Sequence, residues 1–178
     1  NRFRSLDNRK IWDENGRMSF ALPLYSSALV LAMALASQAG GAAAVRIEGW
    51  RRVALVASQL KIPVIGIVKH DLPDSPVRIT PRSEDVRALA DAGAWMIATD
   101  ATHRPRPEPI RDLLELIHAR ACLAMADCAT FEEGMDAHHM GFDCVGSTLS
   151  GYTAERPVAA DAPPDQVLVS RLSSQGVW

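Results

Sequence analysis

The sequence predicts an α/β fold in which parallel strands alternate with helices. Two observations carry this prediction. Short runs of β-branched and other apolar residues alternate with longer stretches of helical periodicity along the whole 178-residue chain. The strand-like runs are apolar almost throughout, which is typical of parallel strands that are covered on both faces.

Composition excludes several classes of protein. A chain of 178 residues with 48% hydrophobic content can bury a core as one domain. Its net charge of −2 leaves no excess of cations to neutralise a phosphate backbone, so we expect no nucleic-acid partner. Cys122, Cys128 and Cys144 show no C-x-x-C spacing, which argues against a disulfide framework or a zinc site and favours a cytoplasmic location.

The first predicted element is a helix in the Ala- and Leu-rich stretch 26–41, "SSALVLAMALASQAGG", which ends at the Gly40-Gly41 pair. A secretory signal is the alternative, but the basic start of such a signal is missing. The apolar run is also shorter than the roughly 20 residues of a membrane-spanning helix. We therefore expect no membrane partner.

The remaining elements follow in alternation. Apolar and β-branched runs predict strands at 43–47, 63–68, 95–99, 122–126 and 143–148. Helical spacing predicts helices at 50–60, 83–93, 110–119, 129–141 and 165–175. Ser83 and Thr130 are suited to cap two of these helices, and Gly93 can end one.

Polar residues at the strand ends favour a closed barrel over an open sheet. They stand at or just past the carboxyl ends of successive strands: Arg46, Lys69, Asp100, Asp127 and Thr148. In an eight-stranded barrel such residues converge on one mouth, where enzymes of this architecture hold their chemistry. An open doubly wound sheet would spread them along a line, and no G-x-G-x-x-G follows the first strand to support a dinucleotide fold. We therefore predict a (β/α)8 barrel.

Five motifs in the same order resemble one family of enzymes: "GGAAAVRIEG" (40–49), "IPVIGIVKHDLPDSPVRITP" (62–81), "ATDATHRPRP" (98–107), "LAMADCATFEEG" (123–134) and "VGSTLSGYT" (145–153). The chain is similar to the N-acetylmannosamine-6-phosphate 2-epimerases, which are TIM-barrel isomerases of sialic acid catabolism. The resemblance implies interconversion of N-acetylmannosamine 6-phosphate and N-acetylglucosamine 6-phosphate. It implies a small amino-sugar phosphate as the only partner in the reaction, with no metal or nucleotide cofactor.

The resemblance also implies roles for three residues. Lys69 matches the family's catalytic lysine, and Arg46 and Asp127 match residues that hold and orient the substrate. Inverting C2 requires a base, and a lysine at the mouth of a low-dielectric barrel has its charged form disfavoured, which suits it to general acid–base catalysis. The alternative for Arg46 and Asp127 is a buried ion pair that closes the barrel mouth.

Other candidates carry weaker signals. Asp100 either touches substrate or accepts N–H groups of its own loop. Thr148 directly precedes the "LSGYT" segment (149–153) and Tyr152 lies within it; this glycine-containing turn is expected to close over substrate, and we expect both residues to bind it. The pairs His70-Asp71 and His138-His139 invite a metal site, but adjacent side chains diverge and no third ligand has useful spacing. We expect solvated surface there and no metal.

The chain departs from the family pattern at both ends. After the helix at 165–175 the family continues with an A-E-G-R motif, which carries a second acid–base residue, and a glycine-serine phosphate loop, whereas this chain ends at Trp178. Phe20 stands where the family has a glutamine. We therefore expect residues 1–178 to form a single barrel-like domain of about six βα units, truncated before the seventh and eighth strands. The chain is then either an inactive relative that at most binds a ligand or partner, or a homo-oligomer in which copies cover each other's open edges.

Overall fold

The structure, a computed structural model, describes residues 23–153, 156–157 and 163–177. Its centre is a five-stranded sheet made of β1 (Val45–Glu48), β2 (Val64–Ile67), β3 (Met96–Asp100), β4 (Leu123–Asp127) and β5 (Cys144–Gly146). All five predicted strands are present within three residues of their expected bounds. Phe20, which stands where the family has a glutamine, lies outside the described residues.

The strand order distinguishes the two candidate architectures. The five strands are parallel and run β1-β2-β3-β4-β5, in the same order as the chain. A doubly wound sheet reverses direction at a switch point, and no reversal occurs here. Strictly sequential parallel strands are the arrangement of a (β/α)8 barrel. The prediction of a barrel-type α/β fold is confirmed over this part of the chain, with β1 and β5 as the edges of the described sheet.

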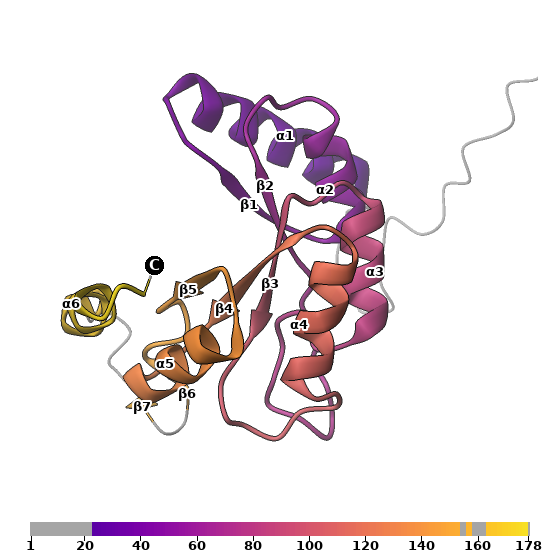
Figure 1. The fold of residues 1–178 in the computed structure, drawn as a ribbon. Coiled ribbons are helices and arrows are strands. Elements are labelled where there is room, and N and C mark those ends of the chain that lie inside the picture. The colour runs from indigo at the N-terminus through magenta and orange to yellow at the C-terminus, as the bar shows by residue number, and fades with distance from the viewer. Residues whose placement is uncertain (1–22, 154–155, 158–162, 178) are drawn as a thin grey trace, which may run out of the picture.

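Helices follow the strands in alternation (Figure 1): α1 (Pro23–Ala39), α2 (Trp50–Ala57), α3 (Ser83–Asp91), α4 (Ile110–Ala119), α5 (Phe131–Met140) and α6 (Gln166–Ser174). In Figure 1, α2, α3 and α4 succeed one another along one side of the strands. Among the described helices, none is long and apolar enough to cross a membrane.

The two faces of the sheet have different cores. The helix-covered face packs against a large cluster that includes Val53, Val56, Leu89, Leu113 and Ile117, all fully buried. The opposite face has a small cluster: Ile67, Ile79 and Ala98, flanked by Ile65, Met125 and Leu149. Because strand side chains alternate between faces, Asp127 shares this second face with Met125, and Arg46 shares it with its register partner Ile65. The polar residues therefore belong to the interior side of the barrel curve.

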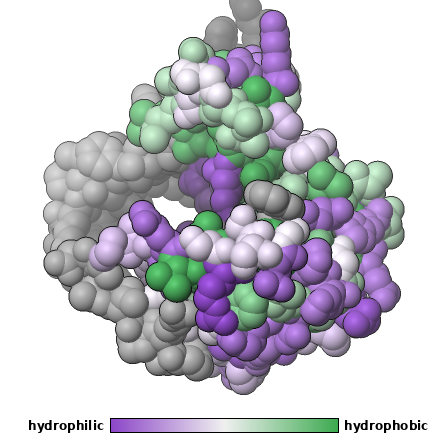
Figure 2. Space-filling model, turned by 60° about the vertical axis from the view of Figure 1, so that its left-hand side comes forward, coloured by the Kyte–Doolittle hydropathy of each residue, from purple (hydrophilic) through white to green (hydrophobic). Residues whose placement is uncertain are grey.

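Hydrophobic surface is most extensive at the top of the view in Figure 2, where Figure 1 places α1. Leu29 and Met33 of that helix are 63% and 62% exposed. Between α1 and the edge strand β1 lies a hollow of about 470 Å³, bordered by apolar residues of α1 and by Arg46 and Glu48 of β1. Arg46 thus has open space on one side.

Helix ends agree with the sequence in one case and differ in another. Thr130 forms a capping box with Glu133, in which each side chain accepts a backbone N–H of the other. Ser83 is not the cap of α3: it is the first helical residue, and its N–H and hydroxyl both donate to Glu108. The expectation was wrong because a carboxylate from a distant loop replaces the local cap, which the sequence around Ser83 does not reveal.

After β2 the chain makes a tight excursion, residues 68–80, which positions Lys69 at the carboxyl edge of the sheet. The chain turns out after Val68 and returns antiparallel, so that Lys69 forms a bridge with Ile79. The His70 N–H donates to the Arg78 carbonyl at 3.0 Å, and the Thr80 N–H donates to the Val68 carbonyl at 2.7 Å. Both ends of the excursion are therefore fixed to each other at the carboxyl edge of the sheet.

Candidate active site

Arg46, Asp127 and Thr148 form a connected cluster at the carboxyl edge. Arg46 Nη1 and Nη2 donate to the two carboxylate oxygens of Asp127 at 2.8 and 2.5 Å. Thr148 Oγ1 donates to Asp127 Oδ1 at 2.7 Å. The Asp127 side chain is fully buried, whereas 27% of the Arg46 side chain is exposed. Three segments far apart in the sequence therefore hold one carboxylate by a forked ion pair and a hydroxyl.

This geometry is the ion pair that the sequence left open as an alternative. The pair does not exclude binding, because the Arg46 side chain remains partly exposed. Gly146 of β5 packs close to this cluster: a Cβ there would stand 2.5 Å from the Met125 methyl group and 3.7 Å from Asp127 Oδ1. A larger residue at this point of β5 would therefore displace the flexible end of Met125, whereas its distance from Asp127 is an ordinary van der Waals contact.

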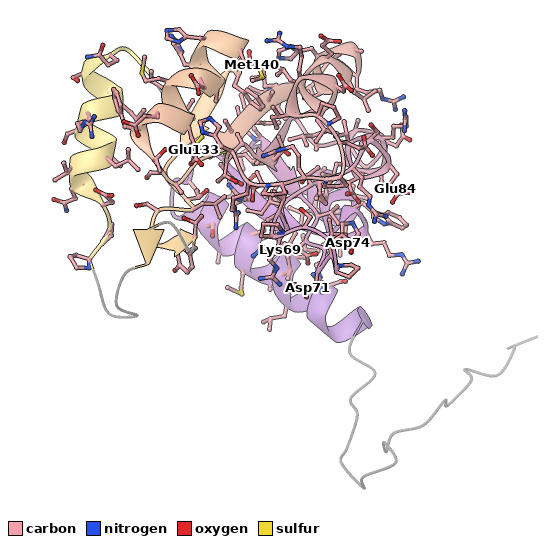
Figure 3. All side chains as sticks on the ribbon, turned by 90° about the horizontal axis from the view of Figure 1, so that it is seen from below. Lys69, Asp71, Asp74, Glu84, Glu133 and Met140 are labelled. Carbon is pink, nitrogen blue, oxygen red and sulfur yellow. The ribbon has the colours of Figure 1, made fainter. Side chains whose placement is uncertain are left out.

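Lys69 lies on the same edge of the sheet. Its side chain is exposed and makes no hydrogen bond or ion pair with any described residue. Figure 3 looks onto this edge and shows Lys69 toward the middle of the view, between Glu133 of α5 on one side and Glu84 of α3 on the other. We expected a lysine desolvated at the mouth of a closed barrel; in the five-stranded sheet of the described residues the Lys69 side chain is exposed, so its desolvation stays a prediction.

The carboxylate of Asp100 is hydrogen-bonded within its own loop. Its carboxylate accepts from the Thr102 N–H at 3.1 Å, the Thr102 hydroxyl at 2.6 Å and Arg104 Nη2 at 2.6 Å, with 1% of the side chain exposed. Arg106 donates to the Asp100 carbonyl at 2.8 Å. Burial lowers the pKa of Arg106, and the Asp100 charge acts in the opposite direction. Of the two alternatives for Asp100, the structure shows the one in which its loop surrounds it.

Glu133 connects the loop after β3 to α5. Beyond its capping role, its carboxylate accepts the His103 N–H at 3.0 Å and the Ala129 N–H at 2.8 Å. The loop after β3 and the first turn of α5 are therefore joined through one buried side chain. The sequence revealed the local cap through the spacing of Thr130 and Glu133, but it held no signal for the link to His103.

Of the other candidate residues, Tyr152 lies away from the Asp127 cluster, and His70 pairs with a buried carboxylate. Tyr152 lies in β6 (Tyr152–Thr153), which pairs with β7 (Arg156–Pro157) apart from the main sheet, and 82% of it is exposed. No hydrogen bond among the described residues links it to Asp127. His70 is not on a solvated helix surface as expected, because its Nε2 lies 2.7 Å from Oδ1 of the buried Asp85.

Metal and thiol chemistry find no support here. The described residues contain no group of three or more His, Cys, Asp or Glu side chains placed to hold a metal ion. Cys128 follows Asp127 directly and is fully buried. Burial, with the nearby charges of Glu133 and Asp127, raises the pKa of its thiol far above the ordinary range. Cys128 is therefore a neutral core residue.

Comparison with known proteins identifies the family of this chain. Residues 30–178 match the family model described as "Putative N-acetylmannosamine-6-phosphate epimerase". The chain belongs to the N-acetylmannosamine-6-phosphate epimerase family. The resemblance predicted from the five motifs is thereby confirmed.

Relatives in this family are similar over most of the chain. A protein of Photobacterium profundum named "Putative N-acetylmannosamine-6-phosphate 2-epimerase" is 52% identical over 154 residues, which are 86% of this chain and 64% of the relative. One of the same name from Escherichia coli O157:H7 is 50% identical over 155 residues, or 86% of this chain and 66% of the relative. The chain thus spans slightly less than two thirds of the length of these relatives.

A solved structure agrees with the fold. The N-acetylmannosamine-6-phosphate 2-epimerase from Clostridium perfringens superposes with a TM-score of 0.80 at 42% identity, over 85% of this chain and 66% of that protein. The five parallel strands and their helices are therefore an epimerase-family arrangement in three dimensions as well as in sequence.

Proposed function

We propose that this chain carries the 2-epimerase chemistry of its family, the interconversion of N-acetylmannosamine 6-phosphate and N-acetylglucosamine 6-phosphate in sialic acid catabolism. The observation that carries the proposal is the arrangement at the carboxyl edge. There a lysine with no side-chain partner among the described residues and a forked Arg–Asp–Thr cluster stand on the interior side of the same sheet. This is the edge where barrels of this type hold their active sites.

Lys69 is the proposed base. The sugar ring opens to an aldehyde, which makes the C2 proton acidic. The neutral ε-amine of Lys69 takes that proton, and the electron pair of the C2–H bond moves toward the C1 carbonyl oxygen to give the enolate of the 2-acetamido aldehyde. A lysine whose side chain has no ion-pair partner among the described residues is suited to this role, because its ε-amine is free to approach the substrate.

Arg46, Asp127 and Thr148 are the proposed substrate-binding group. Asp127 is fully engaged by its two neighbours, so it orients Arg46 rather than moving protons. The Arg46 side chain is partly exposed, and we propose that its guanidinium N–H groups donate to sugar or carbonyl oxygens, where a guanidinium stabilises developing negative charge. Asp100 and Tyr152 have weaker claims, since one is enclosed by its loop and the other lies apart from the cluster.

Epimerisation also requires a proton from the opposite face of C2. None of the described residues at this edge is assigned that role. The reaction therefore separates into two parts that can be measured independently: loss of the C2 proton, which needs Lys69, and inversion, which needs a second donor. We further propose that the reaction takes place in the cytoplasm and that copies of the chain associate.

The test is incubation of the purified chain with N-acetylmannosamine 6-phosphate in D₂O, followed by NMR. Deuterium at C2 together with N-acetylglucosamine 6-phosphate would support the complete reaction. Deuterium without the epimer would reduce the proposal to proton abstraction by Lys69. A folded chain that gives neither would contradict it and leave a family member that at most binds the sugar phosphate.

A further inference from the structure

A histidine–aspartate pair lies directly beside Lys69 and has no assigned role. Nε2 of His70 is 2.7 Å from Oδ1 of Asp85, which stands in the first turn of α3. The Asp85 side chain is 8% exposed and that of His70 is 36% exposed. The pair thus joins the excursion after β2 to the helix that follows it.

The carboxylate of Asp85 is unusual among the described residues. Its Oδ2 atom is buried and has no hydrogen-bond partner, the one such side-chain atom in the described part of the chain. Burying a carboxylate with only one of its oxygens paired is costly. The His70 N–H is therefore the main compensation for this charge, and the pair resists separation.

The position of His70 determines where Lys69 points. Residues 69 and 70 are extended, since Lys69 bridges Ile79 and the His70 N–H bonds to Arg78. Side chains of adjacent extended residues point to opposite faces. Anchoring His70 toward α3 consequently directs Lys69 away from α3, toward the interior side of the sheet. No side-chain interaction among the described residues does this for Lys69 itself.

We propose that His70 and Asp85 form a positioning pair that sets the direction of Lys69 for proton abstraction. The proposal rests on the function proposed above. His70 is a positioning residue: it acts through the backbone of its neighbour and touches no reacting atom.

Four variants test the pair. His70→Ala and Asp85→Ala each remove the anchor, and Asp85→Ala leaves no buried charge behind, so it is the variant better able to fold. His70→Gln keeps an amide N–H near the place of Nε2 and serves as the rescue. His118→Ala is the matched control, because it breaks another His–Asp pair, at 2.9 Å from Asp143, near the amino edge of the sheet.

The kinetic readout is the split between kcat and KM for C2 deuterium exchange. Because displacement of a reacting group by about 1 Å costs on the order of 100-fold, we expect His70→Ala and Asp85→Ala to lower kcat by about 10- to 100-fold with little change in KM. His70→Gln should recover most of kcat, and His118→Ala should leave it unchanged. The double variant His70→Ala/Asp85→Ala should be no slower than the slower single variant, since the two residues act as one unit.

A second readout needs no activity, so that failure of the pair and failure of the proposed function can be told apart. The chain has three lysines, Lys10, Lys61 and Lys69, which give separate NMR signals after reductive ¹³C-methylation. Lys69→Arg and Lys61→Arg variants assign them. In His70→Ala and Asp85→Ala the Lys69 signal should shift while the Lys61 signal stays in place.

The outcomes are distinct. If the wild-type chain shows no exchange but the Lys69 signal shifts in both alanine variants, the proposed function fails and the positioning pair stands. A Lys69 signal that is the same in wild type, His70→Ala and Asp85→Ala would overturn the positioning pair, whatever the activity. Equal loss of kcat in His118→Ala would also overturn it, because the effect would then follow from stability alone.

Discussion

The two edges of the same sheet hold their charges differently. At the carboxyl edge the carboxylates of Asp127 and Asp100 are buried, with 0% and 1% of their side chains exposed. At the amino edge the carboxylates of Asp143 and Asp91 are 34% and 68% exposed and pair with His118 and Arg120. Surface pairs contribute little to stability, whereas buried charges are costly unless fully paired. The costly charges are concentrated where we propose the chemistry, and four substitutions test that contrast.

Asp127→Ala gives the largest expected effect on stability. It leaves Arg46 without its carboxylate and Thr148 without its acceptor, so we expect the free energy of unfolding to fall by about 3 kcal/mol. Urea denaturation measures the change. The paired substitution Arg46→Met with Asp127→Leu removes both charges together and should recover most of the loss. Equal stability of the single and the paired variant would show that the unpaired charge is not the cause.

Glu133→Ala removes the acceptor that joins the loop after β3 to α5. The N–H groups of His103, Ala129 and Thr130 lose their partner, and we expect a loss of about 2 kcal/mol in the free energy of unfolding. Glu132→Ala is the matched control, because Glu132 is the exposed neighbour in the same helical turn. We expect it to change stability by less than about 0.5 kcal/mol. A similar loss in both variants would place the effect in α5 itself.

Asp143→Asn tests the amino edge through pH. Burial raises the pKa of Asp143, but hydrogen bonds from the Ala124 N–H and His118 outweigh it and hold the pKa below its ordinary value. A carboxylate whose pKa is lower in the folded chain stabilises the fold above its unfolded-state pKa, and this contribution is lost as the pH falls through the folded-state pKa. The wild type should therefore exceed Asp143→Asn by about 0.5 kcal/mol at neutral pH and lose that advantage in acid. Thermal unfolding of both proteins across this range provides the comparison, and an advantage that grows in acid would be inconsistent with it.

Lys69→Ala should have the smallest effect on stability of the four. The side chain is exposed and without a partner in the described residues, so we expect a change within about 0.5 kcal/mol in the free energy of unfolding. Thermal unfolding monitored by circular dichroism is sufficient. A large loss would mean that Lys69 supports the fold, and its proposed role as a free base would need another basis.

Much of the fold could be predicted from the sequence because its signals are local. Apolar and β-branched runs predicted all five strands of the sheet, helical spacing predicted the helices between them, and polar residues at the strand ends predicted their convergence on one edge. The links between distant loops could not be predicted. Glu108 replaces the expected cap at Ser83, Glu133 reaches His103, and Asp85 holds His70, each across 15 or more residues of sequence.

For the candidate site too, the sequence predicted some features and not those that depend on contacts between distant segments. The sequence indicated Arg46 and Asp127 as neighbours, and the structure pairs them. It also placed Lys69 at the mouth of the barrel, directly after an apolar run that reads as a strand up to residue 68. The strand instead ends at Ile67, and the antiparallel return at Ile79 carries Lys69 to the surface. Such a return depends on tertiary hydrogen bonds, for which the pattern of apolar residues holds no signal.

The central claim is that the carboxyl edge of this sheet abstracts the C2 proton of an amino-sugar phosphate. The most direct test compares C2 deuterium exchange in Lys69→Ala and Lys61→Ala, because these two exposed lysines lie beyond opposite ends of β2. We predict that exchange is lost in Lys69→Ala and stays at the wild-type rate in Lys61→Ala. Exchange that survives in Lys69→Ala would contradict the assignment of Lys69 as the base.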